Sequence, residues 1–170
     1  EPSDDPLMPG RLILDPPLRF RQPSPLVLPL GMLGRHQAAN AALAAVAAML
    51  LPTTGFPVGL DAITRGLAAA SLPARIEVLA TEPQVIVDGA HNVASMESLL
   101  PTVGGVLALR QPRVLVFAAS RDKPLTEMLA AARGEFDQVV ITRSTCSPRA
   151  ASIETLVTAC REAGMPSPAQ

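Results

Sequence analysis

The hydrophobic positions in the first half of the chain predict two helices that follow two short strands. Residues 36–51 are rich in alanine, which favours a helix by intrinsic propensity, and residues 58–70 carry apolar side chains at helical spacing. Shorter apolar runs at residues 12–14 and 26–28 fit short strands. Eight of the 18 prolines lie within the first 29 residues, so the rest of this stretch is expected to be extended or irregular.

The second half of the chain alternates between strand and helix patterns. Two β-rich runs, at residues 76–79 and 85–87, are split by a turn-like segment and predict a hairpin. After it we expect helices over residues 94–109, 125–133 and 152–163, and strands over residues 114–118 and 139–142. Pro101 and the glycine pair that follows it predict a kink or an early end in the first of these helices. Strands that alternate with helices predict an α/β fold, a mostly parallel sheet flanked by helices.

The most informative polar run is Asp-Gly-Ala-His-Asn at residues 88–92, directly after a predicted strand. Ligands gather at the carboxyl ends of strands in such a fold. Gly89 lets the chain turn without a Cβ clash, and Asn92 can cap the free N–H groups of the next helix. Asp88 then lies where a carboxylate can accept hydrogen bonds from a ligand. The alternative is an ordinary strand-to-helix turn with a buried histidine.

Two further polar clusters follow predicted strands, at residues 120–123 and 142–149. They are expected at the same edge of the sheet as the first cluster. For Asp122 and Lys123, a solvated loop with a weak surface ion pair is the alternative to a role in binding.

Length, composition and charge argue against several classes of function. The length of 170 residues suits one domain, and the net charge of −1 gives no electrostatic footprint for nucleic acid. No apolar stretch reaches the length of a membrane span: the longest, residues 38–51, contains Asn40 and stops at Pro52, so we expect a buried helix and no membrane partner. Two cysteines favour a reduced, cytoplasmic setting over a disulfide framework. The phosphate-loop pattern Gly-x-x-x-x-Gly-Lys-Ser/Thr does not occur in the sequence.

Three clusters taken together resemble the folylpolyglutamate synthase and dihydrofolate synthase family. They are residues 34–42 with His36, residues 73–77 and residues 88–92. That family belongs to the Mur-type ligases, which use ATP to form an amide bond through an acyl phosphate. The resemblance runs from about residue 33 to about residue 149. It implies a Rossmann-like C-terminal ligase domain over residues 33–170, a linker or tail of a central domain over residues 1–32, and an N-terminal ATPase domain that this chain does not contain.

The resemblance also implies roles for individual residues. Asn40 matches the asparagine that binds ATP near the adenine, Arg75 the arginine that reaches the phosphates, and Asp88 the aspartate that holds the nucleotide. An amide can both donate and accept toward a base edge, and a guanidinium suits phosphate oxygens. His91 matches a histidine near the reaction zone and is the catalytic candidate.

Asp122 and Lys123 are weaker candidates for binding the substrate. No metal ligand is predicted in this chain, because most ligands of Mg²⁺ would lie in the missing domain.

Each of these roles has a structural alternative. Asn40 can cap or break a helix start, Arg75 can pair on the surface with Glu77 or Asp61, and His91 can be a core imidazole. The sequence also departs from the family, because Ala74 stands where the family usually has glycine. If that position needs a positive φ, alanine introduces strain there.

The implied reaction is the ATP-dependent addition of L-glutamate to folate or dihydropteroate by a monomeric cytoplasmic enzyme. ATP and Mg²⁺ are the implied cofactors, and the chain by itself is expected to be inactive. A Mur-type ligase of cell-wall synthesis and a non-catalytic α/β module that retains the fold are the two alternatives.

Overall fold

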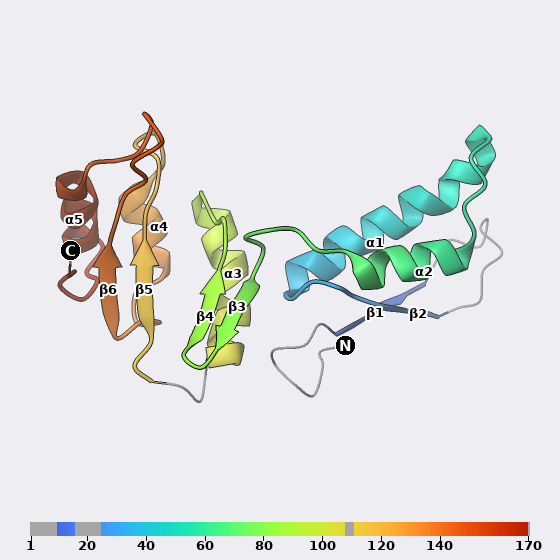
Figure 1. Cartoon of the computed structure of the whole chain (residues 1–170), viewed down its shortest axis with the longest axis horizontal. Coiled ribbons are helices and arrows are strands. Elements are labelled where there is room, and N and C mark those ends of the chain that lie inside the picture. Colours follow the sequence, from blue (N-terminus) through green and yellow to red (C-terminus); the bar gives the residue numbers. More distant parts are fainter. Residues whose placement is uncertain (1–9, 16–24, 108–110, 170) are drawn as a thin grey trace. The chain divides into compact units, whose positions relative to one another are not determined.

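The computed structural model describes residues 10–15, 25–107 and 111–169. The chain forms two compact units, Glu1–Asp88 and Gly89–Gln170, which we call unit 1 and unit 2 (Figure 1). Apart from residues 10–15 and 25–29, the lead-in that the prolines mark as irregular lies outside the described residues.

Unit 1 begins with an antiparallel pair of strands, β1 (Arg11–Leu14) and β2 (Leu26–Pro29), as expected from the two short apolar runs. Helices α1 (Arg35–Leu50) and α2 (Leu60–Ala69) pack on this pair (Figure 1). Side chains alternate along the strands, so one face is buried and the other is exposed. The buried cluster is formed by Leu12, Leu26, Leu28, Ala41, Ala45, Met49 and Ile63.

Helix α1 buries one face only. Its buried residues are spaced four apart, at Gln37, Ala41, Ala45 and Met49, while Leu43 on another face is 73% exposed. The sequence prediction of a buried helix is therefore wrong for most of its surface. The α-helix ends before Pro52, and a 3₁₀ turn, η2 (Leu51–Thr54), continues it.

Helix α1 and η2 together form a helical run of 20 residues, Arg35–Thr54, which is long and apolar enough to cross a membrane. This corrects the expectation that the chain holds no stretch of that length. The criterion is one of length and composition, and core helices of soluble proteins also meet it, so it is weak evidence for a membrane span.

The last part of unit 1 is the predicted hairpin, β3 (Glu77–Thr81) and β4 (Gln84–Val87). The two strands are antiparallel, with an irregularity in register between Val78 and Ala80. Glu77 pairs with Val87 at the open end of the hairpin. The residues before β3 and after β4 therefore leave the hairpin side by side.

Unit 2 contains the alternating part of the chain. It runs through α3 (Val93–Leu107), β5 (Val114–Phe117), α4 (Leu125–Ala131), β6 (Gln138–Ile141) and α5 (Ile153–Glu162). Strands β5 and β6 are parallel, and Ala169 adds an isolated parallel bridge to Val140. The α/β class is confirmed. Among the described residues the strands form three two-stranded sheets, of which β5–β6 alone is parallel, so the mostly parallel sheet expected from the alternation is not formed. Helix α3 continues through Pro101, so the early end predicted there does not occur.

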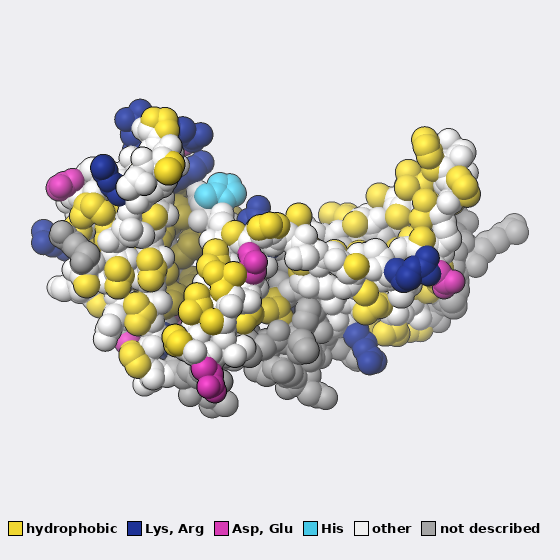
Figure 2. Space-filling model, in the orientation of Figure 1, with side chains coloured by type: hydrophobic (Ala, Val, Ile, Leu, Met, Phe, Trp, Pro, Cys, Tyr) yellow, Lys and Arg dark blue, Asp and Glu magenta, His cyan; other side chains and the backbone are white. Residues whose placement is uncertain are grey.

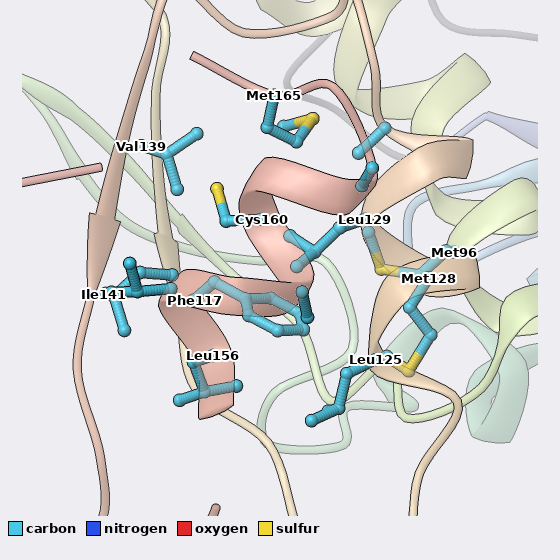
Figure 3. Close-up of a cluster of buried hydrophobic side chains, with 14 of the residues drawn as sticks. Met96, Phe117, Leu125, Met128, Leu129, Val139, Ile141, Leu156, Cys160 and Met165 are labelled. Carbon is cyan, nitrogen blue, oxygen red and sulfur yellow. The ribbon is translucent and has the colours of Figure 1, made fainter. Parts of the chain in front are cut away.

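The core of unit 2 lies between one face of the β5–β6 pair and the helices. Figure 3 shows Phe117 of β5 and Val139 and Ile141 of β6 directed toward side chains of α4 and α5. Met128, Leu129, Leu156 and Cys160 have no exposed surface. This packing fixes the direction of β5 and β6, and the loops that follow them therefore meet at one edge.

Candidate functional site

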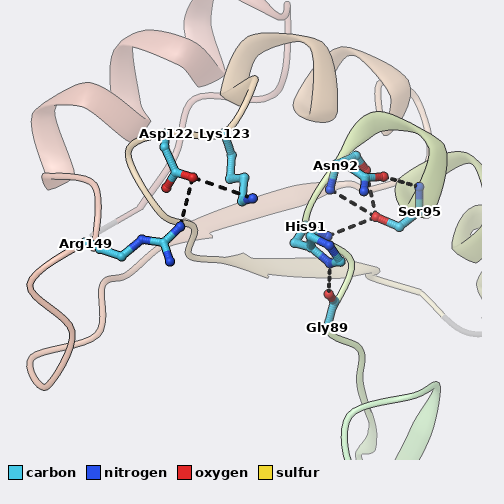
Figure 4. A network of polar contacts seen from close by, with 7 residues as sticks. All are labelled: Gly89, His91, Asn92, Ser95, Asp122, Lys123 and Arg149. Atoms are coloured by element: carbon cyan, nitrogen blue, oxygen red, sulfur yellow. Dashed lines mark hydrogen bonds and ion pairs between the residues drawn. The ribbon is translucent and has the colours of Figure 1, made fainter.

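The predicted cap of helix α3 is present. The Asn92 side chain accepts a hydrogen bond from the Ser95 N–H through Oδ1 at 2.8 Å (Figure 4). In return, the Ser95 hydroxyl oxygen accepts from the N–H groups of Asn92 and His91, at 3.0 and 2.9 Å. These bonds satisfy N–H groups that a helix start leaves free, as capping requires.

The same turn presents His91 to solvent. The ring is exposed, so the core-imidazole alternative is excluded. Its Nδ1 lies 3.0 Å from the Gly89 carbonyl oxygen (Figure 4). Because a carbonyl oxygen only accepts, Nδ1 carries the proton in this contact, and Nε2 of the neutral ring is left as an acceptor. His91 can therefore receive a proton or a hydrogen bond at Nε2.

An ion pair joins the loop after β5 to the loop after β6. Asp122 Oδ2 lies 2.9 Å from Arg149 Nη2 and 3.6 Å from Lys123 Nζ (Figure 4). The Arg121 N–H also donates to the Arg149 carbonyl at 2.9 Å. The surface ion pair that the sequence left as an alternative for Asp122 and Lys123 is thus formed. Their role in binding substrate stays a prediction.

This edge of unit 2 is basic. Figure 2 shows Lys and Arg side chains gathered at the end of unit 2 where β5 and β6 finish. Four of the basic residues lie in the loops that follow these strands: Arg121, Lys123, Arg143 and Arg149. An edge of this charge suits an anionic ligand.

The hydrogen bond from Arg149 lowers the pKa of the Asp122 carboxyl below its ordinary value of 3.8. A lowered pKa in the folded state means that the pairing stabilises the fold above the ordinary carboxyl pKa and is lost as the pH falls through the lowered value. We expect Arg149→Ala to return the pKa of Asp122 toward 3.8, measured by NMR of the carboxyl carbon against pH. The pKa of Glu154, lowered mainly by its own N–H and by Ser152, serves as the control and should not move. An unchanged titration of Asp122 would contradict this assignment.

In unit 1, the turn before β3 has an unusual backbone. Ala74 has a φ of 54° and Ile76 a φ of 48°. Left-handed conformations are uncommon for residues other than glycine, and a β-branched residue such as isoleucine is an outlier there. Each costs roughly 1–2 kcal/mol. The strain that the sequence predicted for Ala74, in case its φ were positive, is therefore present.

Two carboxylates hold this turn. The Ala74 N–H donates to Glu77 Oε2 at 2.8 Å, and the Ile76 N–H donates to Asp88 Oδ2 at 2.9 Å. Ile76 is 2% exposed, so Asp88 satisfies a donor that water does not reach. Asp88 thus links the end of β4 to the segment that carries Arg75.

Arg75 lies between the two strained residues and is half-buried. Among the described residues it makes no hydrogen bond and no ion pair. The surface pair with Glu77 or Asp61 that the sequence left open is not formed. A half-buried guanidinium without a protein anion is suited to bind an anionic ligand, because its planar fork matches phosphate oxygens.

Asn40 is not a helix cap, because it lies in the second turn of α1. Its amide donates to Gln37 Oε1 at 3.2 Å, and the amide of the buried Gln37 lies 3.2 Å from His36 Nε2. Asn40 is exposed, and its side-chain oxygen makes no protein hydrogen bond in the described part of the chain. It can accept a hydrogen bond from a ligand.

The start of α1 lies close to the Arg75 turn. Gly34 has a φ of 104°, and a Cβ atom there would come within 3.0 Å of Ile76 Cδ1 and 2.9 Å of the His36 ring. The hydrogen bond from the Ile76 N–H to Asp88 places Asp88 next to the residue that follows Arg75. The start of α1 lies beside Ile76. That His91 of unit 2 shares this side stays a prediction.

Sequence reasoning did not predict the contacts of several residues that build the site. Arg149, Ser95, Gln37 and the carboxylate of Glu77 all make hydrogen bonds that position a candidate residue. A local signal existed for two of them, because Ser95 and Glu77 lie three residues beyond their partners, a spacing typical of turns and caps. No local signal pairs Arg149 with Asp122, 27 residues away.

Comparison with known proteins identifies the family of this chain. The family described as Mur ligase, glutamate ligase domain, matches residues 74–169, which is more than half of the chain. The chain belongs to the Mur ligase family. The match takes in Arg75, Asp88, His91 and both loops of unit 2, whereas Asn40 lies before it.

Relatives of this Mur ligase domain include enzymes of known structure. It is 38% identical over 141 residues to the dihydrofolate synthase/folylpolyglutamate synthase of Mycobacterium tuberculosis, covering 82% of this chain and 28% of that protein. It resembles the structure of Mycobacterium tuberculosis folylpolyglutamate synthase complexed with ADP, with 35% identity and a TM-score of 0.66 over 85% of this chain and 31% of the other.

A second solved structure is that of the bifunctional folylpolyglutamate synthase/dihydrofolate synthase from Yersinia pestis, complexed with AMPPNP and a Mn ion. It is 31% identical, with a TM-score of 0.61 over 78% of this chain and 30% of the other. The Mur ligase domain described here therefore spans about a third or less of the length of these relatives.

Proposed function

We propose that this chain is the C-terminal domain of a folylpolyglutamate synthase, or of a bifunctional enzyme that is also a dihydrofolate synthase. The parent enzyme adds L-glutamate to a folate or dihydropteroate carboxylate at the expense of ATP. Support comes from the Mur ligase family and from the names of the relatives, which are folate enzymes and not cell-wall ligases. The structural observation that carries the proposal is the half-buried Arg75, which has no protein anion among the described residues.

The residues present fit a nucleotide. Arg75 would hold phosphate oxygens, the free side-chain oxygen of Asn40 would accept from the base, and Asp88 would accept from the nucleotide through the oxygen that Ile76 does not use. When bound, ATP with Mg²⁺ supplies the phosphoryl group that activates the carboxylate. The described residues contain no group of three or more His, Cys, Asp or Glu that could hold a metal ion. We therefore place most Mg²⁺ ligands in the rest of the parent.

In unit 2, His91 is the proposed catalytic residue. Its Nδ1 is held by the Gly89 carbonyl, which leaves Nε2 to take a proton from the attacking amine of glutamate. Lys123, whose ammonium lies beside the Asp122 carboxylate that also binds Arg149, would attract a substrate carboxylate.

The wider organisation is part of the same proposal. Residues 1–32 would be the tail of a central domain, residues 33–170 the C-terminal ligase domain, and an N-terminal ATPase domain would carry the phosphate loop. We propose a cytoplasmic monomer.

The proposal is tested by assaying the full-length parent with ATP, L-glutamate and either dihydropteroate or a reduced folate. ADP release that requires both glutamate and the pterin substrate, with a product one glutamate heavier by mass spectrometry, is the expected result. Residues 1–170 alone should release no ADP, because the sequence holds no phosphate loop. Activity on a cell-wall precursor instead of a folate would overturn the proposal, as would glutamate-dependent ADP release from the isolated chain.

A further inference from the structure

The turn that carries Arg75 is held in a conformation that its residues do not favour. Ala74 and Ile76, on either side of Arg75, both have a positive φ. If either residue relaxed to an ordinary backbone conformation, the chain direction at Arg75 would change, and the guanidinium would point elsewhere. Something outside the turn must therefore keep Ala74 and Ile76 where they are.

Two carboxylates provide this restraint, one for each strained residue. Asp88 binds the Ile76 N–H on the buried side, and Glu77 binds the Ala74 N–H on the exposed side. Glu77 is also the first residue of β3 and pairs with Val87, so its backbone is fixed by the hairpin. Its carboxylate is therefore an anchored acceptor, and its described partner is the strained Ala74.

We propose that Glu77 is a positioning residue for Arg75. By holding the Ala74 N–H, its carboxylate keeps the turn in the left-handed conformation that presents the guanidinium to the nucleotide phosphates. The inference rests on the proposed function, because it assigns Glu77 a role through Arg75. The hydrogen bond to Glu77 also explains how alanine is tolerated at position 74. It offsets the strain of a positive φ, which glycine at this position would not suffer.

The test uses the full-length parent and steady-state kinetics with ATP varied. Glu77→Ala should lower kcat/KM for ATP about fivefold to thirtyfold. The loss should appear in the same constant, KM or kcat, that Arg75→Ala changes. Glu77→Gln should restore most of the loss, since the amide oxygen also accepts the N–H. Glu82→Ala is the matched control, because Glu82 is an exposed glutamate at the turn of the same hairpin with no described partner. It should behave as wild type in kinetics and melting.

Two double variants identify the route of the effect. Glu77→Ala should cause no further loss in an Arg75→Ala background, because the residue it positions is already gone. In an Ala74→Gly background, Glu77→Ala should cost less than it does beside Ala74, because glycine adopts a positive φ without strain.

The outcomes separate the inference from the function beneath it. If Arg75→Ala lowers activity but Glu77→Ala does not, the positioning role is wrong and the proposed function stands. Losses that multiply in the double variant, or a Glu77→Gln variant as poor as Glu77→Ala, also overturn the positioning role. If Arg75→Ala itself leaves the ATP kinetics unchanged, the nucleotide role of Arg75 in the proposed function fails.

Discussion

Arg75→Ala in the full-length parent is expected to reduce kcat/KM for ATP about tenfold to more than a hundredfold, while the melting temperature stays close to that of wild type. Loss of a charge-assisted hydrogen bond costs about 1.5–3 kcal/mol, and each ~1.4 kcal/mol is a factor of ten in rate. Stability should not change much, because Arg75 makes no hydrogen bond or ion pair with the described residues. Substitutions at such positions usually change the free energy of unfolding by about 0.5 kcal/mol or less.

The measurement is steady-state kinetics with ATP varied, beside a melting curve for each variant. Arg65→Ala is the control, since Arg65 is an exposed arginine of the same unit, on α2, without a described partner. Arg75→Lys should recover only part of the loss, because an ammonium cannot present the planar fork of a guanidinium. Unchanged kinetics in Arg75→Ala would leave the nucleotide assignment without its main residue.

Asp88→Ala is expected to lose both activity and stability. The alanine leaves the buried Ile76 N–H without an acceptor, which costs about 1–3 kcal/mol of unfolding free energy. It also removes a carboxylate proposed to hold the nucleotide, so kcat/KM for ATP should fall about tenfold or more. The kinetics of this variant alone do not separate the two roles, because a displaced Arg75 turn and a lost nucleotide contact would both lower kcat/KM for ATP.

Asp88→Asn separates them. The asparagine keeps an oxygen that accepts the Ile76 N–H but removes the negative charge. We expect a melting temperature near that of wild type together with most of the kinetic loss. An Asp88→Asn enzyme that matches wild type in both measurements would contradict a nucleotide role for the charge and reduce Asp88 to a residue that holds the Arg75 turn.

Periodicity and residue type along the chain predict the helices and strands and locate the polar clusters between them. The hairpin before Asp88, the alternation after it and the capping role of Asn92 are local properties, set by residues a few positions apart, and they could be read from periodicity and residue type. The positive φ at Ala74 could be suggested only by the glycine that the resembled family has at this position. Alanine itself carries no signal for a left-handed backbone.

Which polar residues contact one another depends on how the elements pack. Asp122 and Arg149 are 27 residues apart and lie in two different loops. They contact each other because β5 and β6 are neighbouring parallel strands that end at the same edge. Asp88 reaches the Ile76 N–H because the two strands of the hairpin bring their ends together. Glu77, which the sequence left as a possible surface partner of Arg75, instead accepts the Ala74 N–H three residues away, which is a local contact. A hydrogen bond needs a donor–acceptor distance of about 3 Å. The spacing of residues along the chain does not set that distance, whereas the packing of the elements does.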